Sequence, residues 1–173
     1  MKFADLLLLP QTATGRIDQE AARDALPDMP YDVLEQVIVD HGANDDFQRQ
    51  YGHLDLEVIG WELRRTEASA LIAATVFNDF APWFESVARR TRHVLNAGWR
   101  CIDTREAVVD HWREHLTWIR APVFLQVGPG GSAATLHLVE GHTRLAVLRG
   151  LVDLRVVKPE STHEAWIGVP RSL

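Results

Sequence analysis

The chain contains only one cysteine, Cys101, among its 173 residues. A single thiol excludes an intramolecular disulfide framework and any metal site built from several thiolates. Such a composition suits a reducing compartment, and we therefore expect a cytoplasmic protein. With 46% hydrophobic and 24% charged residues, the chain falls in the range of ordinary globular proteins rather than disordered ones.

Long hydrophobic runs are also missing. The opening segment MKFADLLLLP is too short for the apolar part of a signal peptide, contains Asp5 and ends at Pro10 without a small-residue cleavage site. We therefore assign it to the fold. The longest weakly polar stretch, residues 68–77, is far shorter than the roughly 18 apolar residues that indicate a membrane span. We expect no membrane partner.

Basic residues are scarce in the N-terminal part of the chain. Residues 1–60 carry 12 acidic and 4 basic side chains, and residues 61–173 carry 12 acidic and 14 basic ones, so the sums of −8 and +2 give the net charge of −6. Neither part offers the basic stripe that dominates duplex binding, and charge therefore does not indicate a nucleic-acid partner. An acidic helical surface can recognise a basic protein, which leaves a protein partner open.

Helical patterns dominate the first 100 residues. Apolar spacing predicts helices over residues 17–26, with Asp18 as N-cap, and over 30–41, 44–50, 66–77 and 82–98, the last ending at Gly98. Residues 54–65 alternate for a few positions, and we interpret them as a loop leading into a strand. No pattern in this part indicates a function.

The pattern changes after a boundary at about residues 97–103. A helix is predicted from Asp103, with Glu106 at capping-box spacing, to about Arg120, followed by strands over 121–127 and 134–140 joined by the turn GPGGS. A helix over 143–149 with Gly150 at C′ and a strand over 151–157 complete the order. We therefore predict an α+β protein whose helical N-terminal region, residues 1–100, packs on a small mixed sheet formed by residues 101–173.

The segment EGHTRLAVLRG, residues 140–150, carries the clearest functional signal. A strand that ends at Glu140 and turns through Gly141 into a helix leaves the first helical amides without intrahelical acceptors, and the helix dipole adds positive charge there. Gly141 permits close approach of the backbone to a ligand, Thr143 offers a hydroxyl, and Arg144 offers a planar charged fork. The segment predicts an anion site for a phosphate group. The alternative is a strand-to-helix turn without a ligand.

Residues 139–157 resemble the G-H-T-R-L-x-A-x-x-x-L-G segment of the ParB and sulfiredoxin superfamily, especially its ParB-like nuclease-type domains. The similarity covers about residues 104–167. It implies a strand-turn-helix core in which the arginine at the start of the helix, Arg144, contacts nucleotide phosphate with Gly141, His142 and Thr143 around it.

The chain departs from each characterised subfamily. Sulfiredoxins place a reactive cysteine where this chain has His142, so thiol chemistry is not implied. Free serine kinases show D-G-x-H-R, and here Glu140 substitutes for the aspartate while Thr143 replaces the histidine. Partition ParB proteins show G-E-R-R, whose doubled arginine is missing. The resemblance therefore implies a ligand class rather than a known reaction.

Our hypothesis is a phosphate- or nucleotide-binding protein that hydrolyses or transfers phosphoryl groups. Glu140 and His142 are the candidate catalytic residues, with Glu140 as a base or Mg²⁺ contact. Gly141, His142, Thr143 and Arg144 are the candidate phosphate contacts. Whether the protein is an enzyme stays open. The alternatives are a non-catalytic, antitoxin-like protein-binding module that acts through the acidic helices, and a ParB-like DNA-associated nuclease.

Other polar residues have less specific interpretations. His111, Glu114 and His115 spell H-x-x-E-H, the spacing of an inverted zinc-peptidase motif, but no third ligand is evident and an exposed helix edge explains them equally. His163 and Glu164 follow the last predicted strand, where we expect solvated loop residues rather than a general acid or base. We interpret His137 as a half-exposed strand residue.

Overall fold

The computed structural model describes residues 1–128 and 135–170, and the chain forms two compact units within it. The first comprises Met1–Glu62 together with the C-terminal segment from Ile167, and the second comprises Leu63–Trp166. These units follow from packing within the folded chain and do not test the division near residue 100, which stays a prediction.

The predicted α+β class is confirmed. Four strands form one mixed sheet in the order β1-β4-β2-β3, with β1 at Ile59–Glu67, β2 at Val123–Val127, β3 at Thr135–Glu140 and β4 at Thr162–Pro170. Strands β2 and β3 pair antiparallel, with Phe124 opposite Leu138, which confirms the predicted hairpin. Most of the predicted GPGGS turn lies outside the described residues. The ParB-like core stays a prediction.

Short helices build the first unit: η1 (Phe3–Leu8), α1 (Gln19–Ala25), α2 (Tyr31–Val33), the π-helical η2 (Leu34–Val39), α3 (Asp45–Tyr51) and η3 (Leu56–Val58). The predicted cap at Asp18 is confirmed, because its carboxylate accepts a hydrogen bond from the Ala21 amide at 3.0 Å. The apolar faces of these short helices meet in a core that contains Leu6, Ile17, Val33, Leu34 and Ile38.

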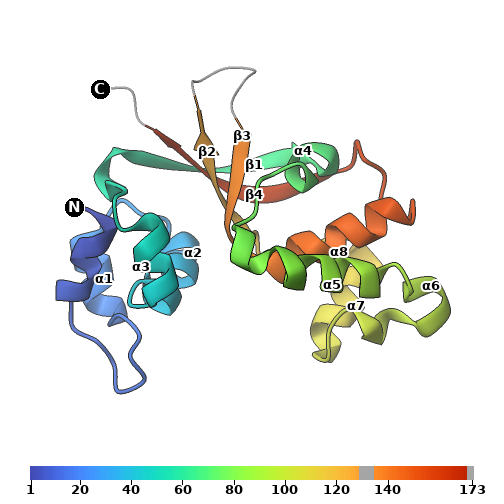
Figure 1. Ribbon diagram of the computed structural model, residues 1–173, viewed down its shortest axis with the longest axis horizontal. Helices are drawn as coiled ribbons and strands as arrows, with labels where there is room; N and C mark the ends of the chain where they lie inside the picture. The colour runs from blue at the N-terminus through green and yellow to red at the C-terminus, as the bar shows by residue number, and fades with distance from the viewer. Residues whose placement is uncertain (129–134, 171–173) are drawn as a thin grey trace. The chain divides into compact units, whose positions relative to one another are not determined.

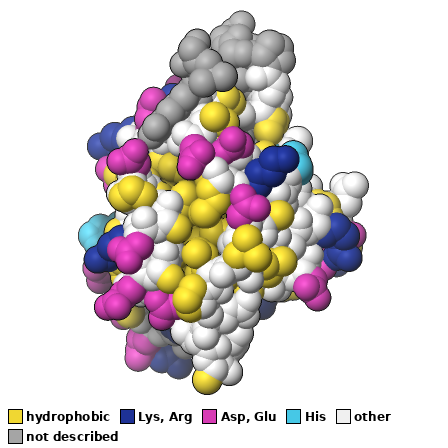
Figure 2. All heavy atoms as spheres, turned by 90° about the vertical axis from the view of Figure 1, so that its left-hand side faces the viewer, with side chains coloured by type: hydrophobic (Ala, Val, Ile, Leu, Met, Phe, Trp, Pro, Cys, Tyr) yellow, Lys and Arg dark blue, Asp and Glu magenta, His cyan; other side chains and the backbone are white. Residues whose placement is uncertain are grey.

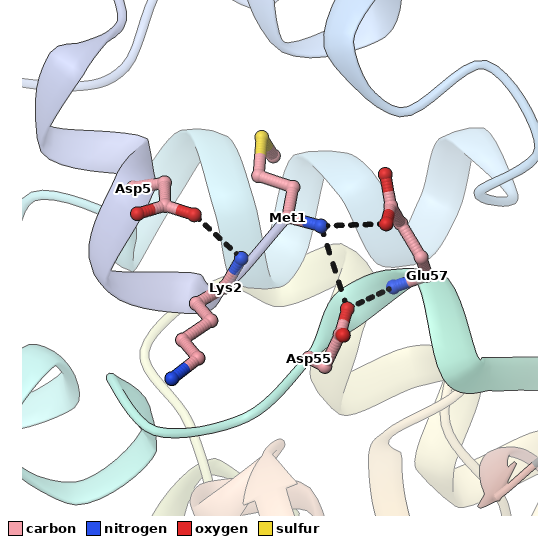
Figure 3. A network of polar contacts seen from close by, with 5 residues as sticks. All are labelled: Met1, Lys2, Asp5, Asp55 and Glu57. Carbon is pink, nitrogen blue, oxygen red and sulfur yellow. Dashed lines mark hydrogen bonds and ion pairs between the residues drawn. The ribbon is translucent and has the colours of Figure 1, made fainter.

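The N-terminal ammonium group is part of a polar network in the first unit (Figure 3). It lies 2.8 Å from the Glu57 carboxylate and 3.4 Å from that of Asp55, and Asp55 also accepts a hydrogen bond from the Glu57 amide. The hydrogen bond to Glu57 raises the pKa of this ammonium group above its ordinary value. The opening segment therefore belongs to the fold, as predicted.

The second unit contains the three longest helices, α5 (Ala81–Thr91), α7 (Glu106–His115) and α8 (His142–Asp153). Its other helices are short: α4 (Ala68–Ile72), η4 (Asn78–Phe80), α6 (Val94–Ala97) and η5 (Trp99–Cys101). Helix α8 is buried on most of its surface and lies alongside α5 (Figure 1). The core between these elements contains Phe84, Ala88, Leu145, Leu148 and Leu151. This packing fixes α8 against α5.

Three helices predicted in the middle of the chain are shorter than expected. The helix predicted over 66–77 covers only Ala68–Ile72, because β1 continues to Glu67 and α4 ends at Ile72. The helix over 82–98 is divided into α5 and α6, although its end at Gly98 is confirmed. Helix α7 begins after Arg105 instead of Asp103 and ends at His115, where Leu116 adopts a left-handed φ of 54°.

Two predictions near the C-terminus are wrong. Residues 151–157 form no strand, because α8 continues to Asp153 and Gly150 lies inside the helix rather than at C′. Strand β4 was not predicted either, and it places His163 in a strand instead of a loop. Within residues 1–128 and 135–170, no helix has both the length and the apolar character needed to cross a membrane.

Candidate functional site

Gly141 forms the turn between β3 and α8. It is the N-cap of α8 with φ 105° and ψ 25°, a left-handed conformation that favours glycine. A Cβ at this position would lie 2.5 Å from Cβ of Pro122 and 3.1 Å from Nε of Arg144. The backbone of β3 therefore enters α8 through a close contact that only glycine satisfies.

The first turn of α8 presents backbone donors. The amide of Leu145 makes the first intrahelical hydrogen bond, to the carbonyl of Gly141 at 2.9 Å. The amides of His142, Thr143 and Arg144 precede it and have no acceptor within the helix. Because α8 is 12 residues long, its aligned peptide dipoles also add partial positive charge at this end. The predicted strand-turn-helix geometry is present.

Arg144 is folded back over the turn and holds neighbouring groups. Its Nη1 donates to the carbonyl of Arg120 at 2.9 Å and to that of Ala121 at 3.4 Å, and its Nη2 lies 3.1 Å from Oε1 of Glu140. Only 20% of the side chain is exposed. The guanidinium therefore braces the segment that precedes β2, a structural role that the sequence did not predict.

Glu140 and His142 flank the same turn. Nδ1 of His142 lies 3.8 Å from Oε2 of Glu140, beyond hydrogen-bond distance, and its ring packs against that of Phe80 with centroids 4.8 Å apart. Nε2 of His142 is buried and has no hydrogen-bond partner among the described residues. The structure thus brings together the carboxylate, imidazole and guanidinium that the sequence singled out.

Two residues beside this cluster, Thr75 and Phe80, were not singled out from the sequence. Thr75 pairs with β3, where its Oγ1 lies 2.9 Å from Nδ1 of His137, and Phe80 covers the imidazole of His142. Burial, and secondarily the charge of His142, lowers the pKa of His137. Thr75 could not be found because residues 66–77 resembled one continuous helix, which would have kept it away from β3. Phe80 belongs to η4, which is remote in sequence from His142, so no local pattern indicates their contact.

His163 and Glu164 lie in β4, so the prediction that both are solvated loop residues is wrong. Glu164 is exposed, but only 5% of His163 is exposed. Nδ1 of His163 lies 3.0 Å from Oγ1 of Thr117, and its ring packs on Trp118 at 5.3 Å between centroids. Its partners therefore belong to the loop after α7 rather than to the turn at Gly141.

Stability is expected to fall as the pH drops from about 7 to 5. Burial, and then the charge of Arg65, lowers the pKa of His163 below its ordinary value of 6.5, and His137 is shifted in the same direction. Below that value the unfolded chain binds protons that the folded chain does not, so the free energy of unfolding decreases. Urea midpoints measured across this range check the slope.

The variant His163→Gln should flatten this dependence. An identical slope in wild type and His163→Gln would contradict the assignment.

The H-x-x-E-H segment does place two imidazoles on one face of α7, since the rings of His111 and His115 have centroids 4.5 Å apart. Across the described parts of the chain, no three or more His, Cys, Asp or Glu side chains gather in a way that could hold a metal ion. A Mg²⁺ ion held by one carboxylate and ligand phosphates requires no such group.

Comparison of this chain with protein-family models, with curated proteins and with solved structures gave no match.

Proposed function

We propose that the start of α8 binds the phosphate group of a nucleotide or another phosphorylated small molecule. The supporting observation is the left-handed turn at Gly141, which presents the first amides of a 12-residue helix beside the guanidinium of Arg144. A phosphate accepts hydrogen bonds from such amides and is stabilised by the helix dipole. The resemblance of residues 139–157 to the ParB and sulfiredoxin superfamily points to the same ligand class.

The residues around the turn divide the work between phosphate contact, metal binding and proton transfer. The amides of His142 and Thr143 and the hydroxyl of Thr143 contact phosphate oxygens, while Arg144 supplies positive charge from its braced position. Glu140 is the carboxylate for Mg²⁺, which proteins commonly hold through one or two carboxylates and ligand phosphates. An ion held there would neutralise phosphate charge. His142, and Glu140 where it does not hold an ion, are the candidates for moving a proton in phosphoryl hydrolysis or transfer.

Thr143→Asp separates ligand binding from folding. A carboxylate in the first turn of α8 favours the helix, so the free energy of unfolding should stay within about 1 kcal/mol of wild type. The same charge repels a phosphate, and affinity should fall by about tenfold or more. Calorimetric titrations with ATP, CTP and pyrophosphate in the presence of Mg²⁺ measure the effect.

Thr143→Val is the matched control, because it removes the hydroxyl without adding charge. Its affinity should lie between those of wild type and Thr143→Asp. Arg144→Ala is a weaker probe, since it also removes the contacts to Arg120, Ala121 and Glu140. Equal phosphate affinity in wild type and Thr143→Asp, or no binding by wild type, would refute the proposal.

A non-catalytic protein-binding module is the second candidate, favoured by the surface of the first unit. Leu7 and Leu8 of η1 are 49% and 85% exposed, in a region that carries an excess of acidic side chains. Figure 2 shows a face where hydrophobic side chains gather at the centre and acidic side chains border them. A protein partner that still binds after Glu140→Ala and Arg144→Ala are combined would favour this candidate.

A further inference from the structure

A pocket of about 210 Å³ lies in the second unit, and neither Glu140, His142 nor Arg144 lines it. Its lining does include Ala121, whose carbonyl accepts a hydrogen bond from Arg144. Its walls come from Arg65 on β1, from the loop that follows α7, and from the first residues of β4. This volume is below the range of drug-sized ligand sites and matches a small metabolite.

One wall of the pocket is polar and fixed in position. His163 is buried, with Nδ1 3.0 Å from Oγ1 of Thr117, and Nε1 of Trp118 donates to the carbonyl of Glu164 at 2.8 Å. Nε2 of His163 has no hydrogen-bond partner among the described residues. A buried polar atom without a hydrogen-bond partner destabilises a fold. Stability of the fold therefore does not explain a histidine at position 163.

Arg65 supplies the positive charge of the pocket. Its Nε and Nη2 donate to Oγ1 of Thr162 at 3.4 and 3.2 Å. A guanidinium has five N–H donors in a planar fork, so these contacts leave it donors for a ligand oxygen. Because Oγ1 of Thr162 accepts from Arg65, its own hydrogen can be donated to the same ligand.

The other titratable side chains of the wall limit the charge of the ligand. Glu164 carries one negative charge against the single positive charge of Arg65. Burial and the charge of Arg65 lower the pKa of His163, so its imidazole is neutral at pH 7. The wall therefore has no net charge, which disfavours a dianion such as a phosphate monoester.

The pocket also has an apolar side. Ile119 lines it and is 60% exposed, although most large hydrophobic side chains of this unit are buried. Trp118 lies beside it and packs edge-on against Trp112, with centroids 6.1 Å apart. Covering Ile119 removes apolar surface from water, which favours a ligand with a hydrocarbon body.

We propose that this pocket binds a small monocarboxylate with an apolar body. The carboxylate accepts hydrogen bonds from the guanidinium of Arg65 and the hydroxyl of Thr162. The hydrocarbon part lies on Ile119 and the edge of Trp118. Planar carboxylate and planar guanidinium match in geometry, which favours this headgroup over a spherical anion.

Butyrate is the probe for this site. Titration of the ¹⁵N-labelled full chain should shift the indole N–H resonance of Trp118 and the amides of Thr117 and His163 in a saturable manner. Arg65→Ala should lower the affinity for butyrate by about tenfold or more, because it removes a charge-assisted hydrogen bond to the carboxylate. Arg64→Ala removes the same charge from the neighbouring position of β1, whose side chain points to the opposite face of the sheet, and should change the affinity by less than about twofold.

Acetate and inorganic phosphate test the two halves of the ligand. Butyrate should bind more tightly than acetate in wild type, and Ile119→Ser should remove that difference. Phosphate should bind more weakly than butyrate. The proposal is overturned if butyrate causes no saturable shift, if Arg65→Ala and Arg64→Ala bind it equally, or if phosphate binds as tightly.

Discussion

Replacing Gly150 by valine is expected to destabilise the second unit by about 3 kcal/mol or more. Gly150 is buried where α8 lies against α5, and a Cβ there would meet the carbonyl oxygen of Ala88 at 2.6 Å and Cβ of Thr91 at 2.6 Å. The first of these is a backbone atom, so no rotation of a side chain relieves the contact. The two helices must move apart, which opens the core around Phe84 and Leu148.

Urea unfolding followed by tryptophan fluorescence measures this effect, since five of the six tryptophans lie in the second unit. Thr143→Val is the control, because it places the same β-branched residue in the same helix at a half-exposed position. It should change the free energy of unfolding by about 1 kcal/mol or less. Similar stabilities for Gly150→Val and wild type would show that α5 and α8 are not in close contact.

Gly141→Ala is expected to lower the free energy of unfolding by about 2–4 kcal/mol. Backbone strain and a steric contact both contribute to this loss. An alanine at φ 105° is strained by its own backbone, and its Cβ would lie 2.5 Å from the rigid ring of Pro122. Relief requires β2 and the start of α8 to separate, which also disturbs the contacts from Arg144 to Arg120 and Ala121.

Gly15→Ala separates these two contributions. Gly15 has a similar φ of 75°, but a Cβ there would meet nothing within 4 Å, so only the backbone strain of about 1 kcal/mol remains. Chemical denaturation of both variants should show the larger loss for Gly141→Ala. Equal losses would mean that Pro122 does not constrain the turn.

Local patterns in the sequence predicted the elements that depend on neighbouring residues. The cap at Asp18, the end of a helix at Gly98 and the β2–β3 hairpin all follow from side-chain chemistry within a few positions. The turn from β3 into α8 was predicted for the same reason. Gly141 is required there by backbone geometry, which a short segment already determines.

Elements fixed by tertiary contacts could not be predicted in this way. Gly150 resembled a helix terminator, yet it is glycine because α5 passes close to it. Strand β4 does alternate, with His163, Ala165 and Ile167 buried, but a histidine and an alanine on the inner face do not give the usual apolar signal of a strand. Residues 151–157 include three valines, which favour a strand, but the first three of these seven residues lie in α8.

In the candidate site, too, contacts between neighbouring residues could be predicted and contacts between distant residues could not. The closeness of Glu140, His142 and Arg144 follows from one strand-turn-helix segment and was predicted. The bracing of Arg120 and Ala121 by Arg144 joins residues more than 20 positions apart, and no local pattern indicates it. The same holds for Phe80, which reaches His142 from another element.

The most direct test of phosphate binding at α8 is a ¹⁵N NMR titration of the full chain with ATP in the presence of Mg²⁺. Amides that receive a phosphate oxygen as acceptor change their chemical shifts. We expect the largest saturable shifts at His142, Thr143 and Arg144, and their loss in Thr143→Asp. Saturable binding that shifts amides elsewhere and leaves the first turn of α8 unchanged would contradict the proposed function.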